Sequence, residues 1–335
     1  MKKLLRLLVV LLIIVSLFSI FGNAENYQWK IQHARPTGTP VDKDVNWMVE
    51  QLKERSEGRI SISIFPAGQL GSYELVQERV GMGEIEMNLA NGLDTSRNRG
   101  LQIQVLPYIV TTWEEAQKSF SSDSAAMSIV ADLLEEQNIK LISVWPSFFG
   151  GIILTKLPNS PADPHVSKNV KIRIPSTKVD ELTAKSLGYQ VTPLAWSEVY
   201  TALQTGIVDG LIGSGAEGCY SMFRDIAKYY LAINDHFENW FFYMNLDLWN
   251  SLPKEDQQLI QEVGSELEKK RFAVAEEEEQ TYMQLIKDSG IEVITFTDEE
   301  LAKIAIKVRE DVWPQVREDI GPELIDQVLA ETNNL

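Results

Sequence analysis

The sequence predicts an α/β protein of two domains. Segments with the periodicity of helices alternate with segments with the periodicity of strands, which is typical of parallel sheets covered by helices. This alternation occurs twice, and we expect the chain to cross between the two units near Gly150-Gly151. The length of 335 residues is sufficient for two domains of ordinary size.

The first 24 residues predict an export signal rather than part of the folded protein. Basic residues among the first six precede an apolar run from Leu7 to Phe21, and Gly-Asn-Ala ends the segment at Ala24. A membrane anchor is the alternative, but a spanning helix needs about 20 apolar residues and this run is shorter. We therefore expect cleavage after Ala24, a periplasmic mature protein, and no direct membrane insertion after cleavage.

The first α/β unit is predicted from residues 41–58, which place apolar side chains on one helical face and end at Gly58. The next segment alternates isoleucine with serine, as a half-buried strand does. The elements expected after the first helix are a strand over 59–68, a helix over 72–83, and strands over 84–91 and 139–146.

The second unit begins with a strand over 170–174, where apolar and basic residues alternate. Pro175 ends this strand, since proline has no N–H to donate to a sheet. Ser197 is the expected cap of a later helix. The elements expected after Pro175 are a helix over 178–188, a strand over 189–194, a helix over 196–206 and a strand over 207–212.

The chain after Pro253 is predicted to be mostly helical. Residues 253–290 can form one helix of more than 30 residues, with only Gly264 interrupting it. A helix of that length would brace two domains.

Composition excludes several classes of partner and site. Removal of 24 residues leaves 311, and loss of three basic residues takes the formal net charge from −17 to −20. An acidic chain repels nucleic acid, which is therefore not an expected partner. The single cysteine, Cys219, cannot form an internal disulfide, and the three histidines (His33, His165 and His236) lack the spacing of a metal site. We expect no metal and no cofactor.

One motif is typical of a dinucleotide site. Residues 213–218 match G-x-G-x-x-G after a strand-like segment, and Asp235 follows about 20 residues later. The alternative is a turn beside a pocket, which we favour because the preceding strand is short and an exported protein rarely has free NAD to bind. No nucleophile or zinc motif accompanies it. An exported dinucleotide-dependent oxidoreductase is the rival interpretation, and we expect no enzyme.

Arg173, at the end of the strand before Pro175, is the main candidate binding residue. A charged residue on a strand usually faces solvent, and the strand pattern alone leaves that alternative open. A planar guanidinium can also bind a carboxylate through two parallel hydrogen bonds.

Residues 171–210, which read strand-Arg-x-Pro, a helix, and then "SEVYTALQTGIVDG", resemble a known family. They are similar to the solute-binding receptors of tripartite ATP-independent periplasmic (TRAP) transporters, the DctP or C4-dicarboxylate-binding family. Further matches are "GRISISIFPAGQLGS" (58–72), "LPYIVTTWEEA" (106–116) and "LWNSLPKEDQQLI" (248–260).

The resemblance implies a two-domain periplasmic binding protein of the class II-like type, with a central cleft, crossing strands and a long bracing helix. It implies capture of a small organic acid for delivery to membrane subunits, with Arg173 binding the ligand's carboxylate. We expect domain I over 25–149 plus 239–280, and domain II over 150–238 plus 281–335.

The sequence departs from the family pattern at two polar positions. Family members often carry a second arginine in a G-x-R-x-L-T segment, where this chain has "GGIILT" and places Ile152. Many also continue "VDG" with an asparagine that touches ligand, where this chain has Gly213. We therefore expect an organic monocarboxylate, possibly aromatic, rather than a dicarboxylate or a sialic acid.

Aromatic residues gather at the corresponding walls and favour an apolar ligand. They fill domain cores as often as binding sites, so each keeps a core alternative. Asn91 and His33 are the polar candidates from the first domain, and if they or water supply further contacts, a small dicarboxylate, keto acid or hydroxy acid fits instead. The aromatic candidates are Trp196, Trp145, Phe148, Phe149, Tyr220 and Trp240.

Overall fold

The computed structural model describes residues 26–90 and 92–332. The expected export signal, residues 1–24, lies outside them. Within the described chain, no helix is long and apolar enough to cross a membrane.

The first sheet has five strands in the order β2-β1-β3-β10-β4. β1 runs parallel to β2 and β3, whereas β10 runs antiparallel to β3 and β4. The sheet is therefore mixed, not parallel as predicted, because β10 arrives from late in the chain and inserts between β3 and β4. The strands are β1 (Tyr27–His33), β2 (Ile60–Phe65), β3 (Met87–Ala90), β4 (Ile139–Phe149) and β10 (Phe237–Asn245).

The second sheet has six strands in the order β11-β9-β5-β8-β6-β7. β6 pairs in parallel with β7 and β8, and β5 pairs antiparallel with β8 and β9. These strands are β5 (Gly151–Leu154), β6 (Lys171–Ile174), β7 (Gln190–Pro193), β8 (Gly210–Ser214), β9 (Tyr229–Leu231) and β11 (Glu292–Ile294).

The chain crosses between the sheets three times, twice through short connections and once through the long helical segment between β10 and β11. The chain passes from the first sheet to the second between Phe149 and Gly151, and returns between β9 and β10. A Cβ atom at Gly150 would lie 2.3 Å from Cε1 of His236. The two connections therefore pack too closely for any side chain at position 150.

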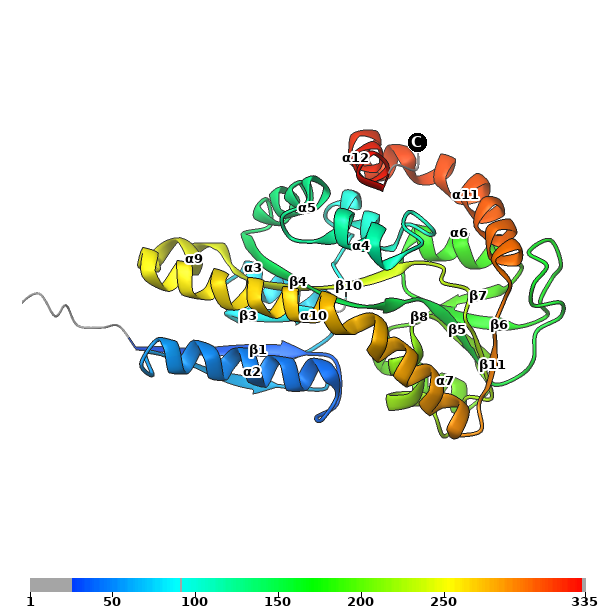
Figure 1. The fold of residues 1–335 in the computed structure, drawn as a ribbon, viewed down its shortest axis with the longest axis horizontal. Helices are drawn as coiled ribbons and strands as arrows, with labels where there is room; N and C mark the ends of the chain where they lie inside the picture. The colour runs from blue at the N-terminus through cyan, green and yellow to red at the C-terminus, as the bar shows by residue number, and fades with distance from the viewer. Residues whose placement is uncertain (1–25, 91, 333–335) are drawn as a thin grey trace, which may run out of the picture.

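Helices cover both sheets (Figure 1). α2 packs on β2, α5 on β4, and α11 on α6, while α12 packs on α4 and α5. The predicted α/β fold is confirmed, and the division into the two expected domains stays a prediction. The helices named so far are α2 (Pro40–Arg55), α4 (Trp113–Phe120), α5 (Ala125–Glu135), α6 (Lys178–Ser186), α11 (Asp298–Ile320) and α12 (Pro322–Thr332).

The predicted long helix is α10 (Lys254–Asp288), of 35 residues. It runs along β4 and continues to the second sheet, where it contacts β11 (Figure 1). Gly264 does not interrupt it, and a Cβ there would lie 2.8 Å from Cγ2 of Ile142. The glycine instead lets the helix approach β4 closely.

The prediction that Ser197 caps a helix over 196–206 is wrong. That segment is a 3₁₀ turn, η2 (Trp196–Glu198), followed by α7 (Val199–Gln204). The Glu198 carboxylate accepts the Ala195 N–H at 3.2 Å, so a carboxylate at the end of the turn does the capping.

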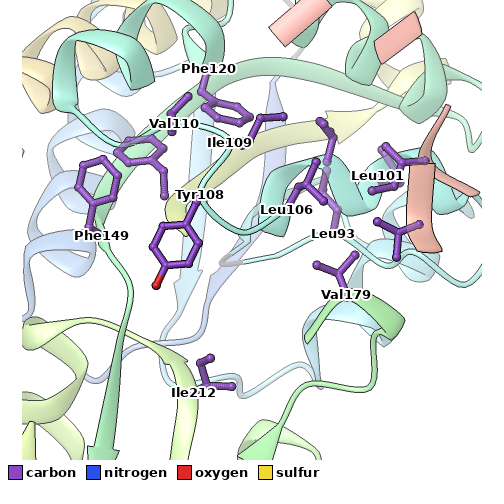
Figure 2. Close-up of a cluster of buried hydrophobic side chains, with 14 of the residues drawn as sticks. Leu93, Leu101, Leu106, Tyr108, Ile109, Val110, Phe120, Phe149, Val179 and Ile212 are labelled. Atoms are coloured by element: carbon purple, nitrogen blue, oxygen red, sulfur yellow. The ribbon is translucent and has the colours of Figure 1, made fainter. Parts of the chain in front are cut away.

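Buried side chains from both sheets share one hydrophobic core. Figure 2 shows part of it, with Phe149 of β4, Val179 of α6 and Ile212 of β8 among the labelled residues. Most of the other labelled side chains come from the segment around η1 (Arg99–Val105) and the loop after it.

Candidate functional site

Two neighbouring cavities lie between the half of the molecule built on the first sheet and the half built on the second. The large cavity, of about 380 Å³, is lined on one side by residues of β1, β3 and α3 (Tyr73–Gly81), and on the other by η2, α7 and the π-turn η3 (Cys219–Phe223). The small cavity, of about 50 Å³, lies beside Arg173. Tyr73 and Trp196 line both, so the two spaces are adjacent.

Arg173 is a buried cation without a carboxylate partner. It is 3% exposed, and its neighbours on β6, Ile172 and Ile174, are buried in the core. Its Nε donates to the Leu194 carbonyl at 2.9 Å. Over residues 26–90 and 92–332, no ion pair and no hydrogen bond from Nη1 or Nη2 accompanies that contact. Burial lowers the pKa of Arg173, but an arginine stays charged in a protein.

Acidic groups share the small cavity with Arg173. Burial raises the pKa of Asp180 to about 6, although the Thr177 hydroxyl donates a hydrogen bond to its carboxylate. Asp180 and Glu74 attract the Arg173 charge electrostatically without contacting it at ion-pair distance. The cavity therefore already holds negative charge on one side of the guanidinium.

A charged histidine cluster forms another wall of the small cavity. The His236 ring contacts Asp235 at 2.7 Å and Glu238 at 3.2 Å. Burial alone would lower the pKa of His236, but the two carboxylates raise it well above its usual value. The two carboxylates therefore keep His236 protonated, and both of its ring nitrogens are already used in contacts with them.

Trp196 forms the wall between the cavities. Its ring lies 5.5 Å from Cζ of Arg173 and packs edge-on against Phe223 at 5.7 Å. The indole Nε1 is buried and has no hydrogen-bond partner in the described part of the chain. Trp196 therefore offers a cavity both an aromatic face and an unused donor.

Gly213 also lines the small cavity. Its φ is +89°, a conformation that favours glycine. A Cβ at this position would lie 3.8 Å from Nη1 of Arg173 and 3.4 Å from Cγ of Pro175. The structure thus brings Arg173, Trp196 and Gly213 together, as the sequence predicted.

The other aromatic and apolar candidates lie away from both cavities. Ile152 and Phe149 are buried in the shared core, and Phe149 packs edge-on against Trp113 at 5.6 Å. Trp240 is buried beside Trp145, at 5.3 Å between ring centroids. Tyr220 packs against Tyr282 at 6.0 Å. Their role as ligand contacts stays a prediction.

His33, a polar candidate of the first domain, does not line either cavity. His33 is the last residue of β1 rather than part of the following loop, and its Nε2 lies 3.2 Å from Oδ1 of Asp42. Burial lowers its pKa, although Asp42 opposes this shift. Asn91 lies outside the described residues.

The glycine motif at 213–218 packs the chain closely and forms only one helical turn, α8 (Ala216–Gly218). A Cβ at Gly215 would lie 2.4 Å from the ring of Phe148, and one at Gly218 would lie 2.1 Å from Oγ of Ser214. Glu217 adds negative charge within the motif, which is unfavourable for a phosphate. These contacts support the turn that the sequence analysis favoured over a dinucleotide site.

Arg35 is a buried residue that the sequence analysis missed. It follows β1, is 2% exposed, and its Nε donates to Glu217 at 2.9 Å. Its Cζ lies 5.2 Å from the Trp196 ring and 5.4 Å from the Trp240 ring. The available signal was a basic residue shortly before the first predicted helix, together with an acidic residue, Glu217, in the glycine motif.

The family follows from a comparison with known proteins. The family model named DctP, "bacterial extracellular solute-binding protein, family 7", matches residues 31–319. The chain belongs to this family. The resemblance found in the sequence is therefore confirmed, and the family consists of binding proteins rather than enzymes.

Similar proteins cover nearly the whole chain. The C4-dicarboxylate-binding periplasmic protein DctP of Rhodobacter capsulatus is 27% identical and covers 94% of this chain and 93% of its own. The ectoine-binding periplasmic protein TeaA of Halomonas elongata is 27% identical over 90% and 89%. The crystal structure of a TRAP periplasmic solute-binding protein from Desulfovibrio salexigens with bound orotic acid has the same fold. It superposes with a TM-score of 0.83 at 22% identity, covering 92% of this chain and 99% of that chain.

Proposed function

We propose that this protein is an extracytoplasmic receptor of a TRAP transporter that binds an organic monocarboxylate through Arg173. The ligand's apolar or aromatic body occupies the large cavity beside Trp196. After binding, the receptor delivers the acid to the membrane subunits of its transporter. The mature form begins after Ala24 in the periplasm.

The observation that carries this proposal is the missing partner of Arg173. Removing a charge from water costs several kcal/mol unless an opposite charge and hydrogen bonds compensate. Nε already donates to Leu194, and neither terminal amino group of the guanidinium has a hydrogen-bond partner among residues 26–90 and 92–332, so both can bind a ligand. A carboxylate bound by these two groups makes two charge-assisted hydrogen bonds and balances the buried charge.

A monocarboxylate is favoured because nothing in the small cavity suits a second anion. Ile152 is buried in the core where family members often carry an arginine, and Gly213 has no side chain. The remaining charges near Arg173 are largely acidic, including Asp180 and Glu238. His236 is the other cation in this wall, but Asp235 and Glu238 already pair with it. A second carboxylate would therefore lie among these acids without a free cation, at a cost of several kcal/mol.

The large cavity is suited to an apolar body. Its walls include Leu89, Ala90, Met222 and Phe223 in addition to Trp196. An aromatic acid would gain both apolar burial and ring contacts there. The orotic acid bound by the Desulfovibrio protein is also a monocarboxylate on a flat ring, although that ring is polar.

A small dicarboxylate, keto acid or hydroxy acid remains the alternative ligand. It is favoured by the relative named for C4-dicarboxylates, and by polar side chains such as Gln104 and Thr95 at the small cavity. An acid of that size would fill only the space near Arg173 and leave the large cavity to water.

A thermal-shift panel of the purified mature protein distinguishes the two. We expect indole and phenyl carboxylates to raise the melting temperature more than succinate, malate, pyruvate or sialic acid. Strong stabilisation by succinate or malate, with none from the aryl acids, would overturn the monocarboxylate assignment. The receptor assignment would survive that result.

A further inference from the structure

Among the described residues that line the large cavity, two side chains have a buried polar atom without a hydrogen-bond partner, Asn88 and Trp196. Asn88 on β3 is 1% exposed and lines this cavity. Its Nδ2 donates to the hydroxyl of Tyr243 at 2.8 Å, and its Oδ1 has no partner among the described residues. Turning the amide around would pair Oδ1 with Tyr243 and leave Nδ2 unused. In both orientations one end of the amide is free, and a buried unpaired polar group is costly.

Two other polar side chains that line the large cavity, those of Gln32 and Tyr200, already have hydrogen-bond partners. Gln32 donates to the Gly71 carbonyl at 3.1 Å and accepts the Leu70 N–H at 2.6 Å. The Tyr200 hydroxyl donates to Asp225 at 2.6 Å. In the wall shared with the small cavity, only the indole Nε1 of Trp196 is likewise buried and unpartnered.

We propose that Asn88 determines specificity by binding an uncharged hydrogen-bonding group at the end of the ligand far from its carboxylate. This inference rests on the proposed function, because the carboxylate of the same ligand is bound by Arg173. The chemical class is a carboxylic acid with an apolar or aromatic body and one distal hydroxyl, amide or ring N–H. We assign an uncharged group because the unpartnered polar atoms of this wall belong to an amide and an indole N–H, and because the acid in the wall, Glu74, would repel an anion.

The positions of the two anchors give this contact a second consequence. Asn88 belongs to the first sheet and Arg173 to the second. A ligand bound at both ends therefore links the two sheets, and an acid without the distal group links them less firmly. The contact between the distal group and Asn88 thus contributes to the stability of the form with a closed cavity.

Pairs of acids that differ by one hydroxyl test this assignment. The pairs are benzoate with 4-hydroxybenzoate, phenylacetate with 4-hydroxyphenylacetate, and 3-phenylpropionate with its 4-hydroxyphenyl analogue. A phenol both donates and accepts, so it serves either orientation of Asn88, and the three lengths vary its distance from the carboxylate. Affinities are measured by isothermal titration for the full mature protein and its variants.

Two variants separate binding from structure. Asn88→Leu keeps the side-chain size but removes the amide, and it also breaks the bond to Tyr243. Tyr243→Phe is the matched control, because it breaks the same bond and leaves the amide in place. Melting temperatures confirm that both variants fold.

We expect the wild type to bind the hydroxylated member of at least one pair about tenfold more tightly or better. Asn88→Leu should reduce that ratio to about twofold or less, and Tyr243→Phe should keep it. The inference is overturned if Asn88→Leu keeps the ratio, or if both variants lose it. It is also overturned if the wild type binds the acids through Arg173 without distinguishing any pair, a result that leaves the proposed function intact. Failure of every acid to bind would overturn the proposed function and this inference with it.

Discussion

Arg35 and Arg173 are two buried arginines with similar surroundings and different partners. They are 2% and 3% exposed, and their guanidinium carbons lie 5.2 Å and 5.5 Å from the same Trp196 ring. Arg35 forms an ion pair with Glu217 at 2.9 Å. Arg173 has no ion pair within the described residues, and its hydrogen bond is to the Leu194 carbonyl, also at 2.9 Å.

The difference teaches how to separate a structural cation from a binding cation. Arg35 follows β1 of the first sheet, and Glu217 lies in α8, directly after β8 of the second. Their ion pair connects the two sides of the molecule and is complete without a ligand. Arg173 is equally buried but has no anionic partner among the described residues. Burial alone therefore does not distinguish a structural arginine from a ligand-binding one, whereas the absence of an anionic partner indicates a ligand-binding role.

Replacing Arg173 should have the largest effect. Arg173→Ala should weaken binding of the carboxylate ligand by about 3 kcal/mol or more, because the ligand's buried charge loses its partner. Arg173→Lys should also weaken it, since an ammonium cannot make the two parallel bonds. Isothermal titration measures both, and an alanine variant that binds within about threefold of wild type would contradict the assignment.

Glu217→Gln should have a smaller effect, and mainly on closure and stability. The amide can still accept from Arg35, so the expected loss is about 1–2 kcal/mol of unfolding free energy. Small-angle scattering should show a smaller radius of gyration for the wild type when ligand is saturating, as expected of closure around a ligand. The Glu217→Gln variant should need a higher ligand concentration to reach this smaller radius of gyration. An unchanged melting temperature, together with an unchanged ligand requirement, would remove Arg35 from this role.

The effect of pH on binding should be smaller than the effects of substituting Arg173 or Glu217. Burial raises the pKa of Asp180 to about 6, and its ionised form repels a carboxylate at Arg173. Binding an anion therefore favours protonated Asp180, so affinity should rise as pH falls from about 7 to about 5, by less than tenfold per pH unit. Asp180→Asn should flatten this dependence in titrations at several pH values. Tighter binding at higher pH would show that Asp180 does not act on the ligand.

Glu279 should have the smallest effect on binding, because it lines neither cavity, and it shows why arginine behaves differently. This carboxylate on α10 accepts the Phe149 N–H at 2.9 Å, and burial raises its pKa to about 7. A buried acid can become neutral, but an arginine cannot. Because the pKa is higher in the folded state, the stability that this group contributes is lost as pH rises from about 4.5 to about 7. Glu279→Gln should reduce the fall in melting temperature between pH 5 and pH 8. An identical fall in variant and wild type would assign the pH dependence to other groups.

Local patterns in the sequence predicted most of the elements and the principal site residue. The alternation over 170–174 with Pro175 gave β6 and the position of Arg173, because both are set by neighbouring residues. The mixed order of the sheets was not predictable from local pattern, since β10 pairs with β3 and β4 only through the tertiary fold. Gly264 was misjudged for the same reason, because its close contact with β4 is a property of packing.

The polar residues of the cavity walls were harder to predict. Asn88 and Arg35 each lie in or just after a strand, where a polar residue usually faces solvent. Their burial depends on the position of the second sheet against the first, and sequence periodicity carries no information about that. The resemblance to a family singled out Arg173 because its motif is local, and its role in binding stays a prediction. The resemblance said less about the walls contributed by the first sheet.

The central claim is that the unpaired charge of Arg173 binds a ligand's carboxylate, and the small molecules retained by the protein test it most directly. Wild type, Arg173→Ala and Glu217→Gln are purified without denaturation, and the compounds released on unfolding are identified by mass spectrometry. The account predicts a carboxylic acid, stoichiometric with wild type, reduced in Glu217→Gln and absent from Arg173→Ala. A retained compound without an acid group, or equal amounts from wild type and Arg173→Ala, would contradict it.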